Sequence, residues 1–80
     1  MTTLPLGFKE ENNVIYGLTD QGLYHIKFNR PEKMNALYVG MYETVNRCME
    51  FAETSDDVKV VLMYGSKGIF CSGNDLENFL

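Results

Sequence analysis

Cysteines, positive charge and long apolar runs are all scarce in this sequence. The chain has 80 residues and only two cysteines, Cys48 and Cys71, which are too few for a disulfide scaffold. No CxxC pair is present, so the commonest sequence mark of a zinc site is missing as well. The pattern indicates two free thiols in a reducing compartment and predicts neither a metal site nor a bound cofactor.

The charge and hydropathy patterns exclude two further classes of protein. There are 7 basic against 11 acidic residues and no basic stripe, so nucleic acid is not an expected partner. The longest apolar run, VVLMY at 60–64, is far shorter than the roughly 20 residues that span a bilayer. The start, MTTLPLGFKEENN, lacks the features of a signal or transit peptide. We therefore expect a soluble protein with no membrane partner and no visible targeting segment.

What is present is an ordinary globular composition, 45% hydrophobic and 22% charged. VIYGLT (14–19) and LYHIKF (23–28) are rich in β-branched and aromatic residues and are predicted to be strands. Gly22 lies between them and can take the positive φ of a short hairpin turn. In the second strand, Tyr24, Ile26 and Phe28 share one face.

From Asn35 the apolar spacing changes to three and four residues, which predicts an amphipathic helix to about Glu53 with Asn35 as N-cap. Its apolar positions are Leu37, Met41, Val45, Cys48, Met49 and Ala52, and we expect Met41, Met49 and Tyr42 to pack in the core. VKVVLMY (58–64) is typical of a parallel-sheet strand that is buried on most sides.

The chain then turns at GSKG (65–68) and begins another helix. Ser72 with Asp75, or Asn74 with Glu77, gives a capping-box pattern. The helix would contain Leu76, Phe79 and Leu80. The order strand, strand, helix, strand, helix start predicts the α/β class. A chain this short buries only roughly 60% of its unfolded surface, so we expect residues 1–80 to be a fragment of a larger domain.

Two stretches can carry chemistry. FCSGNDL (70–76) follows a strand and precedes a helix, so its backbone N–H groups can attract negative charge, and Gly73 lets a ligand approach the peptide. NRPEKMNAL (29–37) contains Lys33, which can meet a phosphate. Taken singly, each stretch is equally compatible with a plain structural role, the first as a helix start and the second as a proline turn.

Together, HIKFNRPEKMNAL and DDVKVVLMYGSKGIFCSGNDL resemble the enoyl-CoA hydratase/isomerase (crotonase) superfamily over roughly residues 14–80. The resemblance implies the first repeat only of a crotonase-like ββα spiral, with 1–80 as its N-terminal portion. Because SGNDL is followed by Asn78 and Phe79, the chain looks most like the Δ3,Δ2-enoyl-CoA isomerases of fatty-acid metabolism.

The resemblance also implies roles for particular residues. The backbone N–H of Asn74 matches one half of an oxyanion hole that stabilises a thioester enolate. The remaining matches are substrate-binding positions: Lys33, Met34 and Ala36 along the pantetheine and phosphate part of coenzyme A, Ser72, Gly73 and Leu76 around its adenine end and the carbonyl, and Asp75 as a helix cap that orders the loop.

The same resemblance implies an acyl-CoA thioester as substrate, with no separate cofactor, and a homo-trimer or hexamer when the protein is full length. It also implies a peroxisomal or mitochondrial location. Two functions stay open. The chain is either part of an acyl-CoA isomerase or hydratase that holds only half the site, or a non-catalytic, truncated crotonase-like protein that assembles with partner subunits.

Residues 1–80 alone are expected to show no turnover of an enoyl-CoA. In the family that the chain resembles, the second oxyanion donor and the acid/base carboxylates follow the position equivalent to Leu80. A spectrophotometric assay of the isolated 80-residue chain tests this expectation, and isomerase activity at the level of the family would contradict it.

Overall fold

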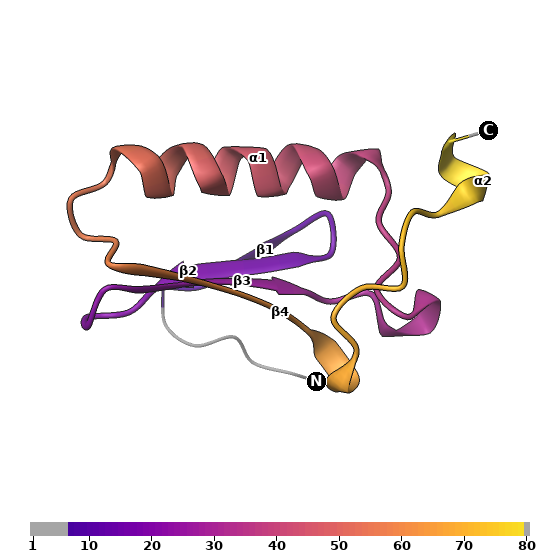
Figure 1. Ribbon diagram of the computed structural model, residues 1–80, viewed down its shortest axis with the longest axis horizontal. Coiled ribbons are helices and arrows are strands. Elements are labelled where there is room, and N and C mark those ends of the chain that lie inside the picture. Colours follow the sequence, from indigo (N-terminus) through magenta and orange to yellow (C-terminus); the bar gives the residue numbers. More distant parts are fainter. Residues whose placement is uncertain (1–6, 80) are drawn as a thin grey trace.

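The computed structural model describes residues 7–79. Within them, a four-stranded sheet in the order β1-β2-β3-β4 carries one long helix on one face (Figure 1). The strands are β1 (Lys9–Glu11), β2 (Val14–Leu18), β3 (Leu23–Phe28) and β4 (Val60–Gly65). The helices are η1 (Pro31–Lys33), α1 (Val39–Thr54), η2 (Ser66–Gly68) and α2 (Leu76–Phe79). The predicted α/β class is confirmed, and Leu80, expected in the last helix, lies outside the described residues.

The hairpin between β2 and β3 forms as predicted. The strands are antiparallel, and the N–H of Gly22 donates to the carbonyl of Thr19 at 3.0 Å. Gly22 has a φ of 87°, in the region that residues with a Cβ seldom occupy. The turn therefore depends on the glycine that the sequence places there.

β1 was not predicted from the sequence. Its three residues are charged and exposed, so neither composition nor alternation marks a strand. It pairs with β2 through a two-residue turn at Asn12 and Asn13, which have φ values of 51° and 62°. Positive φ at both central positions is the requirement of a type I′ hairpin, and asparagine tolerates it better than most residues. The Asn12-Asn13 pair is the sequence feature that could have indicated this hairpin.

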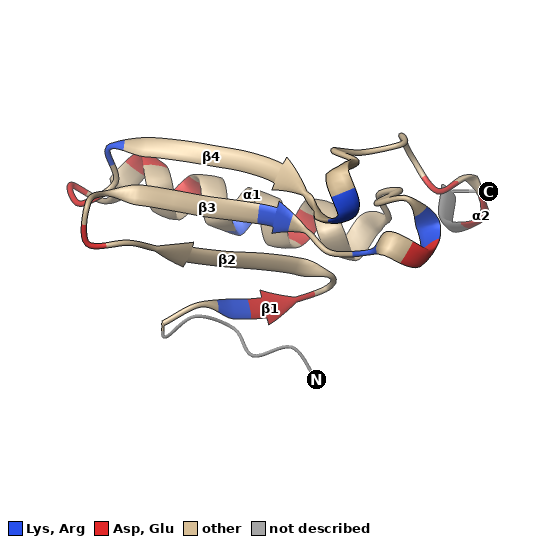
Figure 2. Ribbon diagram, turned by 90° about the horizontal axis from the view of Figure 1, so that it is seen from below, with Lys and Arg blue, Asp and Glu red and all other residues tan. Residues whose placement is uncertain are grey.

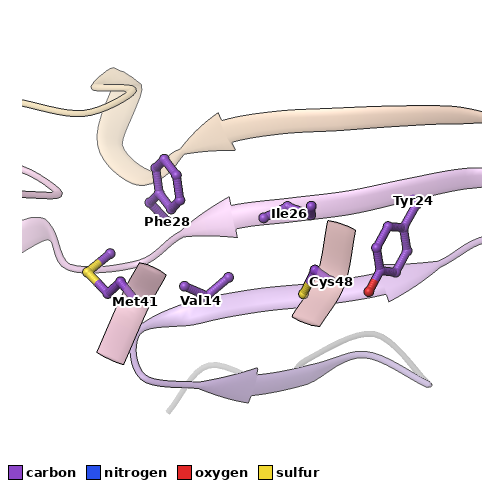
Figure 3. Packing of buried hydrophobic residues seen from close by; sticks show 6 residues of the cluster. All are labelled: Val14, Tyr24, Ile26, Phe28, Met41 and Cys48. Atoms are coloured by element: carbon purple, nitrogen blue, oxygen red, sulfur yellow. The ribbon is translucent and has the colours of Figure 1, made fainter. Parts of the chain in front are cut away.

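The core lies between α1 and the sheet (Figure 3). Val14 comes from β2, and the predicted inner face of β3 supplies Tyr24, Ile26 and Phe28, all of which are buried. From α1 come Met41 and Cys48, one on the first turn and one two turns further on. The spacing of these two residues is what a helix needs to keep one stripe against a flat sheet.

Two helix residues predicted for the core are instead exposed. Met49 is 44% and Tyr42 is 40% accessible. Each follows a buried residue, Cys48 and Met41, by one position. One step along an α-helix turns the side chain by about 100° at 3.6 residues per turn, which carries it out of the buried stripe. Apolar character alone therefore did not decide burial on α1.

The expectation for β4 was right about pairing and wrong about burial. β4 is parallel to β3 in the register Leu23 opposite Val60 to Phe28 opposite Gly65. It forms the outer edge of the sheet and carries no charged residue (Figure 2). Most of its side chains are nevertheless exposed, including Leu62 at 38%. Burial on both faces needs layers and a neighbouring strand that residues 7–79 do not supply.

Replacing the fully buried Met41 by alanine should lower the free energy of unfolding by about 2–5 kcal/mol, since a cavity is left under α1. Met49→Ala is the matched control on the same helix and should change stability by about 0.5 kcal/mol or less. Urea denaturation of both variants provides the comparison. Equal losses would show that α1 does not pack on the sheet through the Met41 stripe.

Candidate functional site

The two sequence stretches that were predicted to carry chemistry meet at one end of the sheet. Because β3 and β4 are parallel, their carboxyl ends at Phe28 and Gly65 lie side by side. The two segments that follow, 29–38 and 66–75, leave the sheet at the same end, where α1 begins (Figure 1). We call them the first loop and the second loop. Open α/β sheets commonly bind ligands beyond the carboxyl ends of their strands.

Asn35 joins the two loops from a fully buried position. Its Nδ2 donates to the carbonyl oxygens of Ser66 at 3.2 Å and Ile69 at 2.7 Å. Its Oδ1 accepts from the backbone N–H of Arg30 at 2.8 Å and from Ser66 Oγ at 3.2 Å. An asparagine amide has two donors and an oxygen with two lone pairs, so this side chain is fully used.

The prediction that Asn35 caps the long helix is therefore wrong. α1 begins at Val39, with Tyr38 in extended conformation as its N-cap residue. Asn35 itself has a φ of 58°, outside the helical region. Asparagine is favoured both at helix caps and at left-handed positions. The local pattern could not separate these two uses, because the buried partners of Asn35 lie more than 30 residues away in the sequence.

A short parallel bridge between Leu37 and Asn74 extends the contact between the loops. The N–H of Leu37 donates to the carbonyl of Gly73 at 2.8 Å, and the N–H of Asp75 donates to the carbonyl of Leu37 at 2.8 Å. Successive N–H groups in an extended chain point to opposite sides. The N–H of Asn74 consequently points away from Leu37, and it makes no hydrogen bond within residues 7–79.

The residues just before Asn74 hold the turn that presents this amide. Gly73 has a φ of 117°, a value that residues with a side chain seldom adopt, and the space where its Cβ would stand is open. Its N–H donates to Cys71 Sγ at 3.3 Å. Cys71 is only partly buried, and its sulfur contacts the backbone of the second loop.

Arg30 and Asp75 form an ion pair across the loops. The distance between Arg30 Nη2 and Asp75 Oδ2 is 2.9 Å, and both side chains are largely buried, at 16% and 14% exposed. Asp75 Oδ1 accepts the N–H of Glu77 at 3.1 Å. Asp75 is therefore the residue that caps α2, whereas neither Ser72 nor Asn74 makes the predicted capping contact. No role was predicted for Arg30 from the sequence.

The other predicted substrate-binding residues lie on the outer surface of the same loops. Lys33, Met34, Ser72 and Leu76 are exposed, while Ala36 is half-buried. Ser72 Oγ donates to the carbonyl of Lys33 at 3.4 Å, which brings the two loops together at this point. The side chain of Asn74 accepts a hydrogen bond from the hydroxyl of Tyr42.

An apolar cavity of about 210 Å³ adjoins the bridge. Leu37 and Cys71 line it from the two loops. The remaining lining residues are Phe28, Met41, Tyr42, Val45, Met63 and Phe70. A larger cavity of about 410 Å³ lies between β2 and α1, but none of the predicted site residues lines it. The smaller cavity is the one that lies beside the Leu37–Asn74 bridge, because Leu37 lines it.

Among the residues that line the larger cavity, two buried side chains have raised pKa values. Burial raises the pKa of the Cys48 thiol. Burial, followed by a hydrogen bond with Cys48, raises the pKa of Tyr24. Both changes favour the neutral forms, which suits side chains packed under a helix. We assign these groups to the core.

Residues 7–79 contain no group of three or more His, Cys, Asp or Glu side chains that could hold a metal ion. No helix in the described part of the chain has both the length and the apolar character required to cross a bilayer.

The arrangement of sheet, helix and loops is that of solved crotonase-like structures. A crystal structure of an enoyl-CoA hydratase/isomerase from Xanthobacter autotrophicus matches with a TM-score of 0.77 and 37% identity, covering 85% of this chain and 25% of that one. The fold class predicted from the sequence is therefore confirmed.

The sequence comparisons agree. The enoyl-CoA hydratase/isomerase family model matches residues 19–80, and the chain belongs to that family. Human enoyl-CoA delta isomerase 2 is 38% identical over 61 residues, which are 76% of this chain and 15% of the relative. Mouse peroxisomal enoyl-CoA delta isomerase 3 is 33% identical over 70 residues, or 88% of this chain and 22% of the relative. The chain thus spans about a fifth of the relatives' length.

Asn35→Ala should lower the free energy of unfolding by roughly 3 kcal/mol, because the buried carbonyl and hydroxyl of Ser66 lose a partner at about 1–3 kcal/mol each. Asn46→Ala, at an exposed position on α1, is the control and should be nearly neutral. Equal denaturation midpoints for the two variants would contradict the structural role of Asn35.

Proposed function

We propose that the N–H of Asn74 is one donor of an oxyanion hole in an acyl-CoA isomerase or hydratase of fatty-acid metabolism. One observation carries the proposal: this N–H has no partner within residues 7–79, while the hydrogen bonds on either side of it hold the backbone in place. A donor that is fixed and unpaired needs no reorganisation when charge develops in front of it.

The chemistry follows from the acidity of a thioester. Loss of a proton from the α-carbon moves negative charge onto the carbonyl oxygen, and an N–H aimed at that oxygen stabilises the enolate. Reprotonation at the γ-carbon would complete an isomerisation, whereas a hydratase would activate water instead. The second donor and the general base would come from residues outside this chain, so the chain would hold half of the site.

Coenzyme A would lie along the exposed surface of both loops. Lys33 offers an ammonium group to a phosphate, and the backbone from Met34 to Ala36 offers a wall for the pantetheine arm. Ser72, Gly73 and Leu76 would border the other side, with Asp75 holding the loop. The contact of Ser72 Oγ with the Lys33 carbonyl supports a single continuous surface. The apolar cavity beside Leu37 and Cys71 suits the acyl chain.

The named relatives favour isomerisation within this family. Two of the similar proteins are enoyl-CoA delta isomerases, and one of these is described as peroxisomal. We accordingly propose the isomerase reaction and a peroxisomal location, with trimer or hexamer formation by the full-length protein.

A non-catalytic protein that assembles with partner subunits is the second candidate. The apolar edge of β4 favours it, because Val60, Leu62 and Met63 are exposed beside an unpaired strand edge within the described residues. On this alternative, changes at the Asn74 amide would leave the protein's role intact. The two candidates therefore differ in one test.

Asn74→Pro in the full-length protein should lower kcat for a 3-enoyl-CoA about 100- to 1,000-fold, the cost of one oxyanion donor. The substitution removes an N–H that makes no hydrogen bond within residues 7–79. Asn74→Ala keeps the N–H and should stay within a few-fold of the parent protein. Equal rates for Pro and Ala variants of equal folded content would refute the oxyanion role.

A further inference from the structure

We propose that Arg30 is a positioning residue that sets the direction of the Asn74 amide. The inference rests on the proposed oxyanion role of that amide and deepens it. Arg30 lies just after β3. Through the Ala36 carbonyl and the Asp75 carboxylate, its guanidinium reaches both chain segments that form the Leu37–Asn74 bridge.

The contacts of Arg30 flank the bridge on both sides. Nη1 donates to the carbonyl of Ala36, the residue directly before Leu37, at 2.8 Å. Nη2 pairs with the carboxylate of Asp75, the residue directly after Asn74, at 2.9 Å. One planar group therefore ties the first-loop segment to the second-loop segment next to the free amide.

The guanidinium is itself held in place. Its central carbon lies 4.7 Å from the centre of the Tyr38 ring, within the range of a cation–π contact. The backbone of Arg30 also accepts the N–H of Asn35 at 2.9 Å and donates to Asn35 Oδ1. The fixed fork of an arginine can serve a carbonyl and a carboxylate together, whereas a lysine is a single point charge.

The position of Asp75 links this clamp to the reaction. Its N–H is bound to the carbonyl of Leu37 at 2.8 Å, and its carboxylate is bound to Arg30. The backbone N–H and the side-chain carboxylate of Asp75 are thus both fixed. Loss of the Arg30 contacts would leave the backbone bridge in place but hold the Asp75 side chain only through its hydrogen bond from the Glu77 N–H. The Gly73–Asn74 peptide, which carries the Asn74 N–H one peptide further back, would then be less well aimed. A misplacement of about 1 Å can cost about 100-fold in rate.

The test compares Arg30→Gln, Arg30→Lys and Asp75→Asn in the full-length protein. The control is Arg47→Gln, which breaks another ion pair, Arg47 with Glu11 at 2.7 Å, away from both loops. For a 3-enoyl-CoA, Arg30→Gln should lower kcat about 10- to 100-fold with KM nearly unchanged. Arg30→Lys should recover part of the loss, because it restores the pair with Asp75 alone. Arg47→Gln should match the parent protein.

A second readout follows the enolate directly. Acetoacetyl-CoA is a β-keto thioester whose enolate absorbs in the ultraviolet, and an oxyanion hole lowers the pKa at which the bound ligand ionises. A tenfold loss of enolate stabilisation corresponds to about one pH unit in that pKa. Arg30→Gln and Asp75→Asn should both raise the pKa of the bound ligand, and the double variant should show less than the sum of the two effects.

Three outcomes would contradict the positioning role of Arg30. A folded Arg30→Gln protein with the kcat and ligand pKa of Arg47→Gln overturns the positioning role. If Arg30→Gln does not fold, a parent-like ligand pKa in both Arg30→Lys and Asp75→Asn overturns it equally. If the parent protein itself does not lower the pKa of bound acetoacetyl-CoA, the proposed oxyanion function fails, and the role of Arg30 fails with it.

Discussion

Parallel pairing of β3 with β4 is the constraint on which the rest of the candidate site depends. The register ends with Phe28 beside Gly65, so two loops that lie far apart in the sequence leave the sheet from adjacent strands. Neighbouring strands are about 4.8 Å apart, a span that an asparagine or arginine side chain can bridge. α1 supports this geometry by covering the inner face of β2 and β3 with the Met41 and Cys48 stripe.

Polar contacts hold the loops together where apolar packing ends. Loops carry backbone groups that must find partners when they are covered. Asn35 meets this need from a fully buried position, and Arg30 does so at the rim with a carbonyl, a carboxylate and an aromatic face. The N–H of Asn74 makes no hydrogen bond within residues 7–79. Its neighbours are bonded, so its freedom is a property of the local geometry.

A site built on a backbone amide places unusual demands on the side chains around it. Gly73 has to take a φ of 117°, and Asp75 has to anchor the chain that follows. The side chain of Asn74 faces Tyr42 and is not needed to supply the donor. On the proposed function, FCSGNDL needs no nucleophile, because the main chain would make the reactive contact and the small residues would leave room for it.

Local pattern by itself determined the strands β2, β3 and β4, the Gly22 hairpin, the buried stripe at Met41 and Cys48, and the motif order that marks the family. Each of these depends on side-chain periodicity or on residues close in sequence. Only the tertiary structure decided the exposure of β4, the buried role of Asn35, the Arg30–Asp75 pair and the direction of the Asn74 amide. The last three of these features join positions that are 30 or more residues apart, and such contacts arise from strand pairing, which local propensity does not encode.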